Sequence, residues 1–385
     1  MIIKNVQLYP IDSPMIELGY LVEQEGKIVK IGPMSQLPDK DFGQVYDLPN
    51  HCVLPGLVDC HCHVGMFGDA IGFENDDANE CSDPCTPHLQ ALDAVNPFDR
   101  CFQEARENGV TTILTGPGSA NPIAGQALTM KTMGSRTEDM VLKTPSAMKF
   151  AFGENPKRVY HERDETPVTR MAVAAIMREN LSKAKEYAEK TRRAGTDHEE
   201  LPDFDAKCEA LIPVLEGKLP AHFHAHRAVD ILAAMRIAGE FNLKYAIIHG
   251  TEAHLVSTHL AEANAAVIAG PLINDRSKPE LAEASIENPG ILAAQGVKLA
   301  LCTDHPETPI QYLLLTAAMA VRGGMSREDA LRAVTLTPAV IAGVGSQVGS
   351  LTEGKDADLV IFAGDPFDVT QRPKLVFING KAVVS

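Results

Sequence analysis

Short stretches in which apolar and polar residues alternate lie at both ends of the chain. Residues 1–10 (MIIKNVQLYP) and 20–32 (YLVEQEGKIVKIG) have the two-residue period of β-strands, with a turn at Gly26. Residues 357–366 (ADLVIFAGDP) and 374–384 (KLVFINGKAVV) repeat this pattern near the C-terminus. The two ends therefore predict one small satellite sheet domain, built from residues 1–54 and 346–385.

The pattern changes between residues 55 and 345, where apolar runs of strand length alternate with helical segments. One helix is predicted over 167–193, and the third strand, within 127–133, has the weakest pattern. Repeated strand–helix alternation is typical of parallel strands joined by crossover helices. The predicted fold class is therefore α/β, a (β/α)8 TIM-type barrel. Residues 66–95 and 154–166 are expected to form long loops on its catalytic face.

The first strand of this barrel carries histidine and cysteine in alternation, in the sequence LVDCHCHVG from Leu57 to Gly65. Successive side chains of a strand point to opposite faces. His61 and His63 should therefore share one face, while Cys60 and Cys62 pack on the other, between barrel and helices. These four residues cannot all bind one ion while the segment stays extended.

Later apolar runs end in further residues of catalytic type. At or near the ends of these runs stand Lys149, His224, His249 and Asp304. A parallel barrel assembles its active site from the carboxyl ends of its strands. The four histidines and the aspartate could therefore form a zinc-type site with an open position for water.

The composition indicates a protein with a large packed core and argues against nucleic-acid and membrane partners. Hydrophobic residues make up 45% of the 385-residue chain, which supports a large packed core. A formal net charge of −16 without a basic cluster argues against nucleic-acid partners. We find neither a signal peptide nor an apolar run of about 20 residues, so we expect no membrane partner and a cytoplasmic location.

The sequence resembles the amidohydrolase superfamily, and in particular its imidazolonepropionase- and prolidase-like metal-dependent hydrolases. The resemblance rests on GKIVKIGP, VLPGLVDCHCHVG, LTPAVIAG and VGSLTEGKDADLVIF, and it runs nearly end to end. The resemblance implies that the two chain ends form a small β-sandwich beside the barrel. It also implies one or two divalent ions, zinc being the expected metal. By position, the implied metal ligands are His61, His63, Lys149, His224, His249 and Asp304.

Lys149 resembles a lysine that some members carbamylate with carbon dioxide so that it bridges two metals. A carbamate is anionic and bidentate, whereas an ammonium group would repel both cations. Glu154 is the rival bridging ligand, and a salt-bridged lysine is the alternative without a metal role. We rank Lys149 above Glu154 because it lies within an apolar run.

The resemblance also implies a reaction, in which Asp304 is the general base for a metal-activated water and His249 a catalytic residue as well as a ligand. Superfamily deaminases typically carry glutamate three residues after the fifth-strand histidine. Arg227 occupies that position here, which favours hydrolysis of an amide bond. Arg227, Arg276 and His226 are the candidate substrate-binding residues, and either arginine could hold a carboxylate by bidentate contact.

The predicted function is therefore hydrolysis of a C–N bond in a small substrate that bears a carboxylate, such as a dipeptide or cyclic amide. Two alternatives remain: a mononuclear-metal deaminase of a heterocycle, and a non-catalytic scaffold. A homo-oligomer is possible, and the sequence names neither the substrate nor the metal count.

Overall fold

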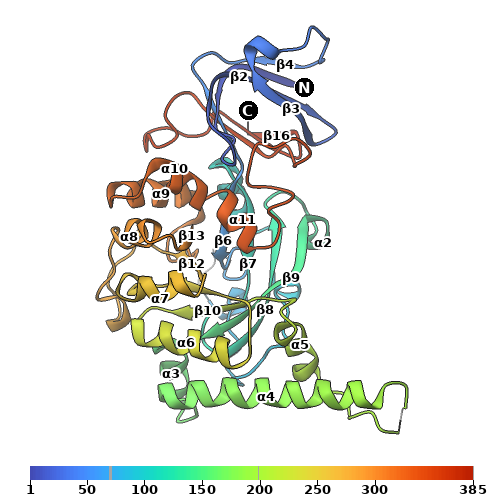
Figure 1. Cartoon of the computed structure of the whole chain (residues 1–385), viewed down its shortest axis with the longest axis vertical. Helices are drawn as coiled ribbons and strands as arrows, with labels where there is room; N and C mark the ends of the chain where they lie inside the picture. The colour runs from blue at the N-terminus through green and yellow to red at the C-terminus, as the bar shows by residue number, and fades with distance from the viewer. Residues whose placement is uncertain (69–71, 198, 385) are drawn as a thin grey trace.

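The computed structural model describes residues 1–68, 72–197 and 199–384. The two chain ends lie together in one sheet, and the rest of the chain forms a barrel below it (Figure 1). The barrel strands are β6 (Leu57–Cys62), β7 (Val110–Thr115), β8 (Ile123–Lys131), β9 (Val141–Ala151), β10 (Ala221–Ala225), β11 (Tyr245–His249), β12 (Ala266–Ala269) and β13 (Lys298–Leu301). They pair in chain order, so the predicted barrel architecture is confirmed.

One strand departs from the all-parallel prediction. β8 contains the weakly predicted third strand, and it pairs antiparallel with both β7 and β9. The reason is the connections. Seven residues join β7 to β8, and the link to β9 holds only the four-residue helix α2 (Thr137–Met140). Connections this short make hairpins, because a parallel pair needs a crossover of a dozen residues or more.

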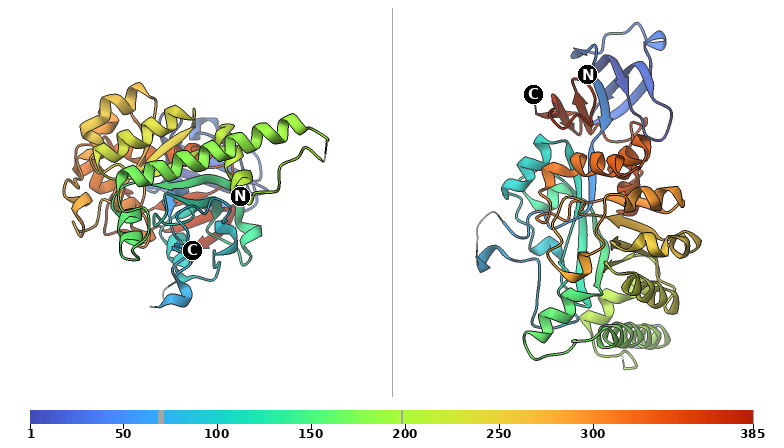
Figure 2. Two further views of the ribbon diagram at one scale, coloured as in Figure 1. Left: turned by 90° about the horizontal axis from the view of Figure 1, so that it is seen from below. Right: turned by 90° about the vertical axis from the view of Figure 1, so that its left-hand side faces the viewer.

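Helices cover the barrel on the outside, and most of them stack along one side of it (Figure 2). Besides α2 they are α1 (Arg100–Glu107), α3 (Glu154–His161), α4 (Arg170–Ala194), α5 (Ala206–Leu215), α6 (Ala228–Glu240), α7 (Ser257–Glu262), α8 (Asn288–Ala294), α9 (Leu313–Arg322), α10 (Arg327–Ala333) and α11 (Leu336–Ile341). Short 3-10 turns include η2 (Phe73–Asn75), η3 (Ala91–Asp93) and η5 (Pro279–Leu281). Across the described ranges, none of the helices combines the length and apolar character needed to span a bilayer.

The two cysteines of the first barrel strand do not share a face. Cys62 belongs to the outer core with Phe102 of α1, as expected, but Cys60 packs inside the barrel in a cluster with Ile248 and Cys302. The prediction was therefore wrong for Cys60. The pairing of β6 with β7 slips by one residue between Asp59 and Cys62. Such a β-bulge interrupts the strict alternation on which the prediction depended.

The terminal sheet contains β1 (Ile2–Leu8), β2 (Ile16–Gln24), β3 (Lys27–Pro33), β4 (Val45–Asp47), β5 (Cys52–Pro55), β14 (Leu359–Phe362), β15 (Leu375–Ile378) and β16 (Lys381–Val384). The two ends of the chain join where β5 pairs antiparallel with β14. Residues of both ends share one core that includes Ile3, Leu21 and Phe377. β5 leads directly into β6, so this sheet lies at the amino ends of the barrel strands and the candidate site at their opposite ends.

One predicted loop is partly helical. Residues 154–161 form α3, which is separated from β9 by two residues and is followed by irregular chain to residue 169. The segment expected as a loop over 66–95 contains only η2 and η3 among its described residues; residues 69–71 of it lie outside them. Both segments contribute to the cavity described next.

Candidate metal centre and active-site cavity

Three predicted ligands meet where the first and last barrel strands end. Asp304 Oδ1 lies 3.1 Å from His61 Nε2 and 3.4 Å from His63 Nε2. Both histidines are buried, and the carboxylate is partly exposed. Burial alone raises the pKa of Asp304, but the surrounding histidines outweigh it and hold that pKa well below its usual range. Asp304 is therefore an anion that faces two imidazoles.

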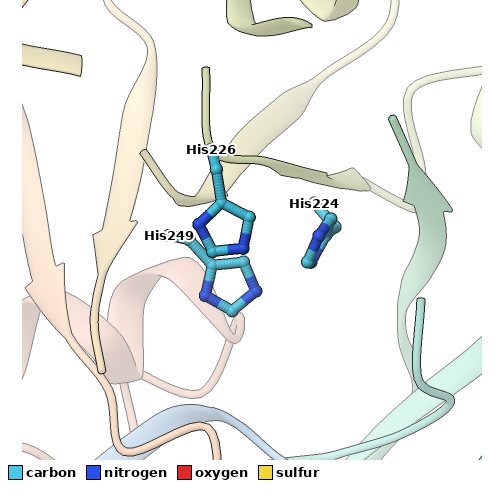
Figure 3. A group of neighbouring side chains, drawn as sticks. All are labelled: His224, His226 and His249. Atoms are coloured by element: carbon cyan, nitrogen blue, oxygen red, sulfur yellow. The ribbon is translucent and has the colours of Figure 1, made fainter. Parts of the chain in front are cut away.

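A second group of histidines lies beside the first. The rings of His226 and His249 are stacked, with centroids 4.5 Å apart and planes 5° from parallel, and His224 stands edge-on to both (Figure 3). One ligand atom from each of these three residues lies within 4.8 Å of the others, and the same holds for His61, His249 and Asp304. His249 therefore joins the two groups.

The hydrogen bonds of these histidines fix which ring nitrogen is free. His63 Nδ1 donates to the carbonyl oxygen of Gly116, and His249 Nδ1 donates to that of Gly270, each at 2.7 Å. A neutral imidazole that donates from Nδ1 keeps a lone pair on Nε2. The Nε2 lone pair of His63 therefore faces a carboxylate oxygen, an arrangement of two acceptors that a cation between them would satisfy.

His224 gives independent support for a cation. Neither of its ring nitrogens has a hydrogen-bond partner in the part of the chain that the structure describes, although the side chain is buried. Buried polar atoms without partners are costly and call for an explanation such as an ion. Burial also lowers the pKa of His224, so the ring favours the neutral form that metals bind. The residues present therefore fit a divalent metal.

Lys149 lies within the cluster, as predicted. It is buried on β9, and its Nζ is 3.4 Å from His61 Nε2. Burial lowers the pKa of Lys149 to about 8, against the opposing effect of Asp304. The rival residue, Glu154, begins α3, and its backbone N–H donates to Glu280 Oε2 at 2.9 Å. Of the two candidates, Lys149 is the one whose side chain reaches the histidines.

Two members of the cluster have unusual backbone conformations. His249 has a φ of 71° and Asp304 a φ of 54°, in the left-handed region that non-glycine residues seldom occupy. Such strain costs about 1–3 kcal/mol per residue and persists where the surrounding structure enforces it, often at functional sites. His249 adopts this conformation at the end of β11, where its ring stacks on that of His226.

Asp59 links the first barrel strand, β6, to the segment that follows the last barrel strand, β13. Its carboxylate accepts the backbone N–H of His61 at 3.1 Å and both the N–H and the hydroxyl of Thr303, at 3.0 and 2.6 Å. Burial raises the pKa of Asp59 to about 7 despite these hydrogen bonds. Asp59 thereby ties the strand of His61 to the residue that precedes Asp304.

The structure adds a buried carboxylate that was not predicted from the sequence. Glu280, in η5, places Oε1 3.7 Å from His226 Nε2, 3.9 Å from His224 Nε2 and 2.9 Å from Lys278 Nζ. Burial raises the pKa of Glu280, but these basic neighbours outweigh it and lower that pKa well below its usual range. Glu280 lies in an irregular segment after β12, where no strand period singles it out.

The two predicted substrate arginines are occupied by backbone contacts. Arg227 donates to the carbonyl oxygen of Pro279, and Arg276 donates to that of Ala284, each at 3.0 Å. Arg276 lines a side cavity that also touches His249 and Asn274. The third candidate, His226, lies in the cluster itself, with its Nδ1 2.7 Å from Thr251 Oγ1.

A cavity of about 1120 Å³ opens above the cluster. Its walls come from the 66–95 segment, from α3 and from the segment after β12, and they combine apolar with charged side chains. The members of the cluster that line this cavity are His63, Lys149, His224, His226, His249 and Asp304. This volume suits a small molecule, and the cluster forms part of its wall.

Comparison with known proteins identifies the family to which the chain belongs. The model of the Amidohydrolase family matches residues 52–383. The chain is 32% identical to the amidohydrolase tasK of Hapsidospora irregularis over 95% of its own length, but spans only 40% of that protein. It is 25% identical to the imidazolonepropionase of Acidiphilium cryptum, covering 92% of this chain and 89% of that one.

Among solved structures, an amidohydrolase from Thermotoga maritima MSB8 superimposes with a TM-score of 0.94 and 41% identity over 99% of both chains. The resemblance that the sequence motifs indicated is thus confirmed. The chain belongs to the amidohydrolase family, and it is a hydrolase that acts on carbon–nitrogen bonds.

Proposed function

We propose that this enzyme hydrolyses the amide bond of a small substrate that carries a carboxylate, such as a dipeptide or a cyclic amide. The observation that carries the proposal is the cluster at the cavity wall. There the Nε2 lone pairs of His63 and His249 and the unpartnered nitrogens of His224 converge with the ionised Asp304. The name of the Acidiphilium relative, imidazolonepropionase, refers to a propionate, which is a carboxylate.

The residues that would hold one or two divalent ions, zinc being the expected metal, are His61, His63, His224, His249 and Asp304, with Lys149 as the bridging ligand after carbamylation. When bound, such an ion lowers the pKa of a coordinated water and polarises the substrate carbonyl. His249 suits the role of ligand better than that of a donor to the substrate, because its only N–H already points to Gly270.

Asp304 is the proposed general base. Its low pKa keeps it ionised at neutral pH, and its partial exposure gives it access to the cavity. As the water oxygen bonds to the carbonyl carbon, Asp304 accepts the water's proton. It then returns a proton to the leaving nitrogen as the C–N bond breaks, which yields an acid and an amine.

A deaminase is the second candidate, and Glu280 is the observation in its favour. A buried carboxylate beside the fifth-strand histidine is the kind of group that protonates a ring nitrogen. However, Glu280 contacts Lys278 and the N–H of Glu154. It is not among the described residues that line the cavity. These contacts favour the amide hydrolase. The third reading, a non-catalytic scaffold, leaves the cost of burying so many unpaired polar groups unexplained.

A substrate panel on metal-analysed protein tests the proposal. We expect one or two equivalents of zinc or a similar ion, and turnover of dipeptides or cyclic amides by the wild type. Asp304→Asn should lower kcat by about 100-fold or more, as is usual for loss of a general base. Release of ammonia from aminated heterocycles would favour the deaminase, and full activity in metal-free protein would refute the mechanism.

A further inference from the structure

One wall of the active-site cavity is made by a single face of α3. Asn155, Arg158 and Val159 line the cavity, while Pro156 and Tyr160 of the same helix are buried against the protein. Positions 155, 158 and 159 are related by the i, i+3 and i+4 spacing that brings side chains together on one side of a helix. This face of the helix is therefore directed toward the substrate.

Lys278 is held against this wall by one hydrogen bond and one ion pair. Its Nζ donates to Asn155 Oδ1 at 3.0 Å and contacts Glu280 Oε1 at 2.9 Å. Asn155 in turn donates to Ser119 Oγ at 2.7 Å. An ammonium group has three donors, so one donor of Lys278 is left, and the residue lines the cavity. Its position is set before any substrate arrives.

The guanidinium group of Arg158 is available to bind a ligand. The residue is exposed and lines the cavity, and its guanidinium group has no hydrogen bond or ion pair within the ranges 1–68, 72–197 and 199–384. A guanidinium group offers five N–H donors in a planar fork that matches a carboxylate. Because Lys278 is bonded to Asn155, one helical turn from Arg158, the two cations lie on the same part of the wall.

Away from the α3 wall and the histidine cluster, the cavity lining is mainly acidic, and the one further arginine among its described residues, Arg163, donates to the carbonyl oxygen of Cys81. The segment after β6 contributes Asp76, Asp77 and Glu80 to the lining, and the chain as a whole has a net charge of −16. A carboxylate entering the cavity is repelled by these groups and attracted to the α3 wall.

We propose that Arg158 and Lys278 form the subsite that binds the substrate's carboxylate, with Arg158 as the main specificity residue. The inference rests on the proposed function and gives that site its carboxylate-binding residues. The carboxylate is thereby placed at other residues than the arginines expected from the sequence, because neither Arg227 nor Arg276 is among the described residues that line this cavity.

The test compares a dipeptide with its C-terminal amide, which differ only in the charged group. In Arg158→Gln, kcat/KM for the dipeptide should fall about 10- to 100-fold, the usual effect of losing hydrogen bonds between charged groups. The value for the amide should change less than about threefold. Lys278→Gln should shift the ratio in the same direction, and Arg158→Lys should restore part of it.

Lys157→Gln is the matched control, because it removes one positive charge from the same helix at a position outside the described cavity lining. It should leave the ratio unchanged, and thermal midpoints will show that each variant is folded. An unchanged ratio in both Arg158→Gln and Lys278→Gln would overturn the subsite.

A binding measurement separates this proposal from the proposed function. Calorimetry with N-acetylalanine and N-acetylalaninamide tests the carboxylate preference without turnover. If the wild type prefers the acid and Arg158→Gln does not, the subsite stands even if no amide is hydrolysed, and only the proposed function fails. If the wild type hydrolyses amides but shows no such preference, only the subsite fails.

Discussion

The ammonium group of Lys149 lies 3.4 Å from Nε2 of His61, inside the barrel and within a cluster of histidines. A cation in this place would repel a metal ion, whereas a carbamate on the same nitrogen would bind one. At this distance, whether Lys149 is an ammonium or a carbamate should decide whether the histidine cluster binds a metal ion.

Activation of metal-free enzyme by carbon dioxide should depend on pH through Lys149. Only the neutral amine attacks carbon dioxide, and burial lowers the pKa of Lys149 to about 8. At fixed dissolved carbon dioxide, the rate of activation on adding metal should rise about tenfold per pH unit below 8 and level off above it. Stopped assays between pH 6 and 9 measure this rate.

Lys143, on the same strand, provides the control for that experiment. Lys143→Gln should keep the full response to carbon dioxide, while Lys149→Gln should lose it together with bound metal. Activation that needs no carbon dioxide, or metal retained in Lys149→Gln, would exclude the carbamate.

Mutation of the histidines in the first strand should affect metal binding, whereas mutation of Cys62 should affect stability. His61→Ala and His63→Ala each remove a ligand candidate and should lower metal content together with activity. Cys62→Ala removes a thiol that is buried in the outer core, so it should cost about 1 kcal/mol of stability but keep the metal. Elemental analysis and urea unfolding measure the two effects. Loss of metal in Cys62→Ala would show that the thiol takes part in the centre.

Thr303 should affect metal affinity without touching metal. Its hydroxyl and N–H both donate to Asp59, which also holds the N–H of His61. Thr303→Val leaves a buried carboxylate without one donor, so we expect weaker metal binding by about tenfold and a less stable fold. Thr303→Ser keeps the hydroxyl and should bind metal normally. Equal affinity in both variants would rule out this positioning role.

The sequence was most informative where chemistry lies on regular strands. His61, His63, His224, His249 and Asp304 follow apolar runs, and parallel strands bring such positions together without any knowledge of the loops. The parallel rule failed at β8, because the rule assumes a crossover helix and the segments on either side of β8 are too short to form one.

Other features depend on contacts that leave no period in the sequence. Cys60 turns inward because of a one-residue bulge, and a bulge has no reliable sequence signal. Glu280 and Arg158 reach the site from an irregular segment and from a helix that was expected to be a loop. Their roles follow from which segments pack together, and that is decided by tertiary structure.

Gly153 should prove intolerant of a side chain because of Glu280. A Cβ at Gly153 would lie 2.7 Å from Glu280 Oε2, and the residue has a φ of +89°. Gly296 has a similar φ of +76° but open space around it, so Gly296→Ala should cost only the backbone strain, about 1 kcal/mol. Gly153→Ala should cost about 2 kcal/mol more, since Glu280 must leave its donors. Urea unfolding of the two variants measures the difference, and equal losses would mean that Glu280 moves aside without cost.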